Sequence, residues 1–278
     1  MKRLSSILAA TAVCAGLASA PLANAAQLTP QQVAGNAAQS TLAPLEVTPE
    51  LEQQTWYQKY KDDPRVDKLQ ATSPAMNGRK IPLAVIRATD ENRPTIYLLN
   101  GAGGAEQDMD WLKLSDAVDF YHSKNVNVVI PQAGAFSYYT DWISEPNSEF
   151  LQGPQKWETF LTQELPAVLR EGWRSTDKRA VLGLSMGGTA AMNLAERHPS
   201  LFDFVGSFSG YLDTTSYGMP QAIGAATLDA GGYDAQKMWG PYGSQGWIDH
   251  DPKLGVENLK DMSVYVSSGN GNAGPFDR

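Results

Sequence analysis

The chain alternates short apolar runs with longer stretches in which apolar residues recur at helical spacing. The short runs predict strands at 81–86, 95–99, 126–130, 180–184, 202–208 and 263–266. The helical spacing predicts helices over 157–169 and 186–197. Short apolar strands separated by helices are typical of a parallel sheet covered on both faces. The pattern therefore indicates an α/β fold from about Val66 onward.

The amino-terminal segment has the pattern of a secretory signal peptide. Lys2 and Arg3 precede an apolar run over 4–20, and 23–25 reads as an A-x-A cleavage site. The run is short for a membrane span, and no other apolar stretch approaches ~20 residues. We expect export with cleavage near Ala25 and no stable membrane span.

The next segment carries no periodic pattern. Residues 26 to about 47 are rich in Ala, Gln, Pro and Thr, which indicates a linker or mobile arm. The sequence at 48–50, Thr-Pro-Glu, predicts the start of a short helix. The expected organisation is a signal peptide at 1–25, an arm with a short helix at 26–65 and an α/β domain at 66–278.

Composition narrows the classes of function. The chain has 278 residues, a hydrophobic content of 42% and a net charge of −8, so it is globular and a poor candidate for nucleic-acid binding. Its one cysteine, Cys14, lies in the predicted signal peptide, which excludes a disulfide framework and a thiolate zinc site. The three histidines lack the spacing of metal ligands, so we expect no metal and no cofactor.

The strongest chemical motif is G-x-S-x-G at 183–187, directly after a predicted strand and at the start of a predicted helix. In that context the motif predicts a nucleophile elbow, in which a sharp turn presents the hydroxyl of Ser185 above the sheet. The helix that follows places its positive end near the developing oxyanion. The alternative is a turn of small residues that packs a strand on a helix.

An acyl-transfer site also needs two backbone donors for the oxyanion. The N–H of Met186, the residue after the nucleophile, is one candidate. The other is the N–H of Ala102 in the glycine-rich loop 100–104, where Gly101 and Gly103 allow the backbone to approach a substrate closely. This loop lacks the G-x-G-x-x-G spacing of a dinucleotide site. An ordinary glycine-rich turn is the alternative.

A serine nucleophile needs a base, and the sequence offers three histidines. His122 reads as a surface helix end, and His198 lies at the carboxyl end of the elbow helix, away from the serine. His250 is the remaining candidate, with Asp229 or Asp234 as its acid. A strand is predicted after it, whereas the catalytic histidine of this architecture follows the last strands. A solvated loop histidine is the favoured interpretation.

A series of short segments, in order along the chain, matches one family. They are 97–101 (YLLNG), 139–142 (YTDW), 156–161 (KWETFL), 164–166 (ELP), 183–186 (GLSM), 198–199 (HP), 209–210 (SG), 212–213 (LD), 229–233 (DAGGY), 238–241 (MWGP) and 268–271 (SGNG). These segments resemble the antigen 85 mycolyltransferases, especially those of corynebacteria and their relatives. The similarity runs from roughly Val66 to Gly271.

The resemblance implies a secreted enzyme with the α/β-hydrolase fold. The family transfers a mycolyl group from trehalose monomycolate to a second trehalose monomycolate or to arabinogalactan, through an acyl-serine. Ser185 matches the family nucleophile, and Met186 and Ala102 match the oxyanion donors. Asp213 matches a position that contacts trehalose, and a carboxylate can accept hydrogen bonds from sugar hydroxyls.

Departures from the family pattern bear on the expected site. The family has aspartate where Asn100 stands, which places Asn100 among the expected substrate contacts. It has Leu-Arg at 102–103, where the arginine holds the sugar, and cysteine where Ser268 stands. Its catalytic glutamate and histidine lie well after the Gly-Asn-Gly segment, whereas this sequence stops at Arg278. We therefore expect the sequence to be a carboxyl-terminally truncated piece of a longer protein.

Three functions remain open from the sequence. The first is mycolyl transfer, and the second is an exported carboxylesterase, favoured by the arginine-free loop. The third is a non-catalytic envelope or matrix-binding protein, favoured if the chain truly ends at Arg278. Some family members bind fibronectin, but residues 119–129 differ from the family region, so no fibronectin binding is inferred.

Overall fold

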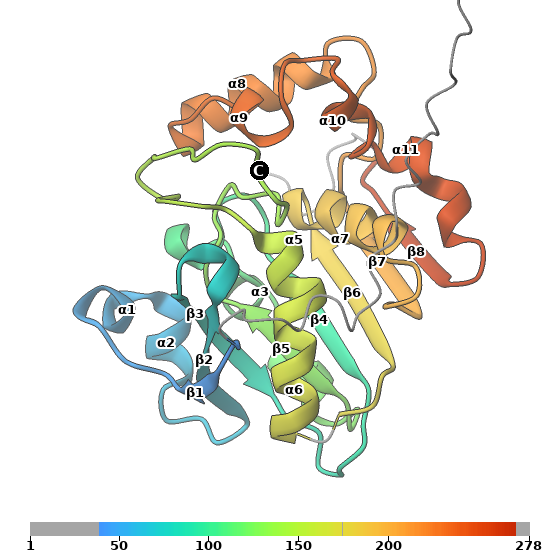
Figure 1. The fold of residues 1–278 in the computed structure, drawn as a ribbon. Helices are drawn as coiled ribbons and strands as arrows, with labels where there is room; N and C mark the ends of the chain where they lie inside the picture. Colours follow the sequence, from blue (N-terminus) through green and yellow to red (C-terminus); the bar gives the residue numbers. More distant parts are fainter. Residues whose placement is uncertain (1–38, 174, 271–278) are drawn as a thin grey trace, which may run out of the picture. The chain divides into compact units, whose positions relative to one another are not determined.

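The computed structural model describes residues 39–173 and 175–270 (Figure 1). The predicted signal peptide and the first part of the predicted arm lie outside these residues. Within them, eight strands form one sheet in the order β1-β2-β3-β5-β4-β6-β7-β8. The strands are β1 (Leu42–Pro44), β2 (Val66–Ser73), β3 (Arg79–Ile86), β4 (Thr95–Leu99), β5 (Asn127–Pro131), β6 (Arg179–Leu184), β7 (Phe204–Phe208) and β8 (Ser263–Ser267).

The strand directions confirm the predicted, mostly parallel sheet. Strands β5, β4, β6, β7 and β8 are parallel neighbours, whereas β1, β2 and β3 are antiparallel to their neighbours at the other side. The six predicted strands are present, with ends shifted by no more than two residues. Two strands were not predicted. One of them, β1, lies inside the predicted arm and pairs with β2, so the arm is ordered there.

The described helices flank and extend this sheet. They are α1 (Pro49–Gln53), α2 (Thr55–Tyr60), α3 (Trp111–Leu114), α4 (Ala117–His122), α5 (Trp157–Thr159), α6 (Leu165–Trp173), α7 (Met186–Arg197), α8 (Met219–Gly231), α9 (Gln236–Trp239), α10 (Gln245–Ile248) and α11 (Pro252–Gly255). Short 3-10 turns are η1 (Pro74–Met76), η2 (Ala105–Gln107) and η4 (Val256–Leu259). The predicted start of α1 is confirmed, because the Thr48 hydroxyl accepts a hydrogen bond from Leu51 N–H.

The helix predicted over 157–169 is present but not uniform. A π-helical turn, η3 (Phe160–Glu164), separates α5 from α6. Pro166 has no N–H to donate to the carbonyl four residues earlier, so an ideal α-helix cannot run through this point. The hydroxyl of Thr162 donates to the carbonyl of Glu158 at 2.7 Å and satisfies part of the opened turn.

Successive side chains of the central strands supply two separate cores. Tyr97 and Leu99 face one side with α5, α6 and α7, while Leu98 faces the other with α1 to α4. Each of these three β4 side chains is fully buried, as expected for a strand covered on both faces. In Figure 1, α6 and α7 lie across the front of the sheet, and α8 to α10 form a group above it.

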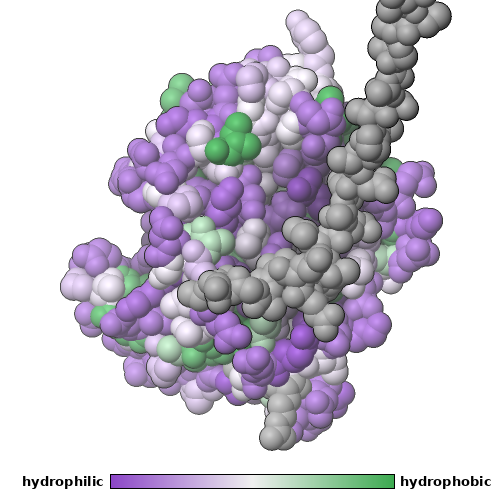
Figure 2. Space-filling model, viewed as in Figure 1, coloured by the Kyte–Doolittle hydropathy of each residue, from purple (hydrophilic) through white to green (hydrophobic). Residues whose placement is uncertain are grey.

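The last strand in the sheet, β8, is the most exposed. Val264, Tyr265 and Val266 are each about half exposed, at 46–50%. On the face drawn in Figure 2 the coloured surface is mostly hydrophilic, with hydrophobic residues in separate small spots. None of the helices in residues 39–173 and 175–270 has the length and apolar character needed to cross a membrane.

Candidate active site

The turn between β6 and α7 holds Ser185 in an unusual conformation. Its φ of 54° and ψ of −119° lie in a region that a residue with a side chain rarely adopts. The Ser185 N–H donates to the carbonyl of Phe208 at 2.8 Å, and its carbonyl accepts from the N–H groups of Gly188 and Thr189. These bonds fix the strained turn at the carboxyl end of the parallel strands.

Two glycines make this turn possible. A Cβ on Gly183 would lie 1.9 Å from the carbonyl oxygen of Gly187, and a Cβ on Gly187 would lie 2.5 Å from the carbonyl oxygens of Leu99 and Asn100. Only a residue without a side chain fits at either position. The first turn of α7 is therefore in contact with the end of β4.

The glycine-rich loop after β4 lies beside the serine. A Cβ built on Gly101 would be 3.8 Å from the Ser185 Cβ. The carbonyl of Ala102 accepts a hydrogen bond from Phe136 N–H at 2.7 Å, which anchors the loop. Among the described residues, the N–H groups of Ala102 and Met186 have no hydrogen-bond acceptor. Two unused backbone donors thus lie on the two segments that flank Ser185, an arrangement suited to an oxyanion.

The side chain of Asn100 is not placed to contact a substrate, which corrects the expectation from sequence. Asn100 is fully buried. Its Nδ2 donates to the Pro131 carbonyl at 2.8 Å and its Oδ1 accepts from Trp111 N–H at 3.1 Å. Both ends of the amide are therefore used to hold the loop.

Gly103 is also enclosed by its own loop. A Cβ on it would lie 2.9 Å from Gln107 Oε1 and 3.1 Å from Met109 Cγ. The absence of a side chain at Gly103 is thus explained by loop packing, whereas the expected substrate contact has no support in this geometry.

Asp213 is placed in the loop after β7, and its side chain is 39% exposed. Its Oδ2 lies 2.7 Å from Nζ of Lys253, a residue of α11. The carboxylate is therefore accessible and already paired with one cation.

None of the described histidines forms a hydrogen bond with Ser185. His122 is exposed at the end of α4, as predicted, and His198 follows the carboxyl end of α7, as predicted. His250 is only 9% exposed, so the expectation of a solvated loop histidine is wrong. Its imidazole stacks on the Trp239 ring at a centroid distance of 4.8 Å. The described residues thus supply a candidate nucleophile without a candidate base.

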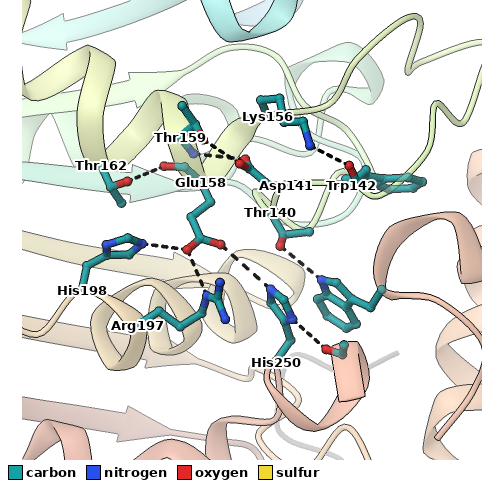
Figure 3. Close-up of polar contacts among 12 residues, drawn as sticks. Thr140, Asp141, Trp142, Lys156, Glu158, Thr159, Thr162, Arg197, His198 and His250 are labelled. Atoms are coloured by element: carbon teal, nitrogen blue, oxygen red, sulfur yellow. Dashed lines mark hydrogen bonds and ion pairs between the residues drawn. The ribbon is translucent and has the colours of Figure 1, made fainter. Parts of the chain in front are cut away.

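The buried carboxylate of Glu158 joins two of these histidines in one cluster (Figure 3). His198 Nε2 and Arg197 Nε lie 2.7 Å and 2.9 Å from Glu158 Oε1, and His250 Nε2 lies 3.9 Å from Glu158 Oε2. Burial opposes ionisation of Glu158, but the hydrogen bonds and charges of His198 and Arg197 outweigh it. Together they lower the pKa of Glu158 to about 2.

Burial has the larger effect on His250. Desolvation lowers the pKa of His250, against the opposing effect of a hydrogen bond between its Nδ1 and the Gly246 carbonyl at 2.7 Å. His250 is therefore neutral at neutral pH and is used in packing.

The role of Glu158 was not predicted from the sequence. Its histidine partners lie 40 or more positions away along the chain, and no local pattern indicates that such distant residues form one cluster. Within the described residues, no group of three or more histidine, cysteine or acidic side chains is arranged to hold a metal ion.

Comparison with known proteins identifies the family. Residues 73–275 match the family model described as "Putative esterase". The diacylglycerol acyltransferase/mycolyltransferase Ag85A of Mycobacterium leprae (strain TN) is 38% identical over 209 residues, which are 74% of this chain and 63% of that protein. The chain belongs to the antigen 85 family. Antigen 85 relatives from other mycobacteria agree, such as Ag85B of Mycobacterium intracellulare, at 37% identity over 74% of this chain and 63% of that protein. The chain therefore spans less than two thirds of the length of these antigen 85 relatives.

Solved structures place the antigen 85 chain in the α/β-hydrolase fold. The crystal structure of Mycobacterium tuberculosis MPT51 (FbpC1) superposes with a TM-score of 0.65 at 32% identity, covering 72% of each chain. FphF, a fluorophosphonate-binding serine hydrolase of Staphylococcus aureus, superposes with a TM-score of 0.54. At 14% identity, over 72% of this chain and 77% of that one, this second likeness concerns the fold alone.

Proposed function

We propose that the protein is a serine acyltransferase that moves mycolyl groups from trehalose monomycolate to a second trehalose monomycolate or to arabinogalactan. The observation that carries the proposal is the strained Ser185 turn, flanked by two unused backbone donors, in a chain of the antigen 85 family. The Ag85 relatives are named mycolyltransferases, which supports this choice of acyl group.

The chemistry is a two-step exchange of esters. The Ser185 oxygen attacks the ester carbonyl, its proton passes to a base, and the N–H groups of Ala102 and Met186 stabilise the oxyanion. Trehalose leaves with a proton, and the acyl group remains on the serine. An acceptor hydroxyl then attacks the acyl-serine and gives its proton to the base. The base returns a proton to the Ser185 oxygen as its bond to the acyl group breaks, which regenerates the free serine. The base is unassigned, since none of the described histidines contacts Ser185.

The site of action proposed is the outside of the cell. The signal-peptide pattern at 1–25 supports export, and trehalose mycolates and arabinogalactan are the proposed partners there. Amino-terminal sequencing of the protein recovered from culture medium tests export, with a new terminus just after Ala25 as the expected result.

The test of the nucleophile is covalent labelling. A fluorophosphonate probe should add to the natural protein, measured as a mass increase, and Ser185→Ala should abolish the addition because the attacking oxygen is gone. Ser209→Ala is the matched control, since Ser209 directly follows the neighbouring strand β7 and has the same φ of 54°. Labelling that persists in Ser185→Ala, or that disappears in Ser209→Ala alone, would contradict the assignment.

A second candidate is an exported carboxylesterase. It is favoured by the loop at 101–104, which presents only glycine and alanine where the family has a sugar-holding arginine. The two candidates differ in the acceptor. With a trehalose ester as donor, a transferase forms the trehalose diester as its main product, whereas an esterase releases the free acid at an undiminished rate when trehalose is added.

A further inference from the structure

The loop between β7 and α8, residues 209–218, is fixed at its start to the nucleophile helix. A Cβ on Gly210 would lie 2.7 Å from the backbone of Gly188 and Thr189, so the two chains are in close contact. The Thr189 hydroxyl accepts from Tyr211 N–H at 2.8 Å and also lies 3.0 Å from the Tyr211 carbonyl as a donor. The β7–α8 loop thus begins one helical turn from Ser185.

The far part of the same loop is held by a buried carboxylate from another segment. Asp251 is only 2% exposed, and its Oδ2 accepts hydrogen bonds from both the N–H, at 2.9 Å, and the hydroxyl of Thr215. Its Oδ1 accepts from Lys253 N–H at 3.1 Å and so caps α11. Thr214 adds a hydrogen bond from its hydroxyl to the His250 carbonyl at 3.2 Å.

The segment that carries Asp251 is itself rigidly packed. Its neighbour His250 is stacked on Trp239 and faces Glu158, and Gly255 lies directly against the carboxylate of Glu196 on α7. Both anchors of the β7–α8 loop are therefore connected to α7, the helix that follows Ser185.

The loop presents polar and aromatic groups to solvent. Tyr211 is 48% exposed, the Asp213 carboxylate between the anchors is accessible beside Lys253, and Tyr217, just past the second anchor, is fully exposed. Exposed aromatic rings and a carboxylate are groups that suit a polyhydroxylated acceptor.

We propose that Asp251 is a positioning residue for the sugar acceptor: it holds the shape of the β7–α8 loop, which carries Tyr211 and Asp213 and begins one helical turn from Ser185. The proposal rests on the acyltransferase function proposed above. Asp251 acts through Thr215 and does not touch the substrate. Its loss should therefore weaken use of the acceptor while leaving formation of the acyl-serine intact.

The experiment compares two steps in the natural protein and in Asp251→Asn. The first is the rate of Ser185 labelling by the fluorophosphonate probe, and the second is transfer from a trehalose ester with trehalose as varied acceptor. We expect the KM for trehalose to rise by about tenfold or more, since the amide has one acceptor oxygen where the carboxylate has two and cannot accept from both Thr215 and Lys253. Labelling and hydrolysis by water should stay within about twofold of wild type. Asp249→Asn, at the exposed neighbour, should leave both unchanged.

Two substitutions at Thr215 distinguish the loss of loop positioning from a general loss of folding. Thr215→Val removes the hydroxyl donor to Asp251 and should raise the KM for trehalose by several-fold. Thr215→Ser keeps that donor and should behave as wild type. Equal losses of labelling and transfer in Asp251→Asn, or an unchanged KM for trehalose, would overturn the positioning role while the acyltransferase proposal stands. A wild-type protein that is not labelled would overturn both.

Discussion

The buried carboxylate of Glu158 stays ionised because Arg197 and His198 contact it. Removing that charge leaves the Arg197 guanidinium and the His198 imidazole without their acceptor. A fully buried pair loses roughly 3–5 kcal/mol when one partner is removed, and Arg197 is still 37% exposed, so the loss here should be smaller. We expect Glu158→Gln to lower the free energy of unfolding by about 2–3 kcal/mol at pH 7 in urea titrations.

The pH dependence of this loss identifies its cause. The folded pKa of Glu158 is lowered from 4.5 to about 2, so its stabilising charge is present above pH 4.5 and is lost as the pH falls toward 2. The difference between Glu158→Gln and wild type should therefore shrink over that interval. Glu149→Gln, at an exposed loop position, is the control and should change little. A difference that does not vary between pH 7 and pH 3 would point to packing instead of charge.

For Glu196, on α7, we expect a pH dependence of stability with the opposite sign. Burial, with a smaller contribution from the charge of Asp251, raises the pKa of Glu196 from 4.5 to about 8. As the pH rises, Glu196 loses its proton at a lower pH in the unfolded chain than in the folded protein. The wild type therefore loses stability as the pH rises from about 4.5 to about 8. Glu196→Gln removes that loss and should gain roughly 2–4 kcal/mol relative to wild type over the interval.

Thermal unfolding at a series of pH values measures the gain in Glu196→Gln. Glu257→Gln, an exposed residue of the adjacent η4, serves as the control. A difference between Glu196→Gln and wild type that stays constant from pH 5 to pH 8 would show that Glu196 is ionised at ordinary pH in the folded protein.

At the scale of elements, the contact between α7 and β4 depends on Gly187. A methyl group there would lie 2.5 Å from two carbonyl oxygens, so Gly187→Ala must push the helix from the strand. We expect a loss of about 1–3 kcal/mol or more in the free energy of unfolding, together with slower labelling of Ser185. Chemical denaturation and the labelling rate measure the two effects.

The matched substitution is Gly172→Ala in α6. A Cβ at Gly172 would lie 3.5 Å from Leu42, an ordinary contact, and alanine is the better helix former. This variant should be unchanged or more stable by up to about 1 kcal/mol. Equal stability of the Gly187 and Gly172 variants would contradict the close contact between α7 and β4.

Elements with strong local patterns were predictable from the sequence, and others were not. Strand β4 and helix α7 have the predicted bounds because each is a mostly buried run with a clear break after it, at 100–101 and at 198–199. The edge strand β1 and its neighbour β2 are partly exposed, so their mixed sequences resemble a loop. The helix over 157–169 was drawn as uniform because the apolar period continues through Pro166, where the backbone changes to a π turn.

The candidate site, too, was predictable from the sequence only in part. The turn at Ser185 follows from five consecutive residues, so the motif was sufficient to predict it. The inward orientation of Asn100 depends on Pro131 and Trp111, which no local pattern reveals. The packing of His250 depends on Glu158, which is still more distant along the chain.

For the molecule as a whole, β8 and β1 are the two edge strands of the sheet among the described residues. Strand β8 pairs with β7, and its apolar side chains are about half exposed. Exposed edges of this kind are sites where further strands or other chains add to a sheet. The opposite edge is β1, a strand of three residues that ends in Pro44, and a short edge strand with a proline pairs less readily with another chain.

The span of α7 has a mechanical consequence. A helix of 12 residues is a stiff rod of about 18 Å, and this one has Ser185 before its first residue and His198 after its last. The hydroxyl of Ser185 and the charged cluster of Glu158 thus lie at opposite ends of one helix. A small rotation of α7 caused by a substitution in the Glu158 cluster would move the hydroxyl, so such a substitution can lower the reactivity of Ser185 without contacting it.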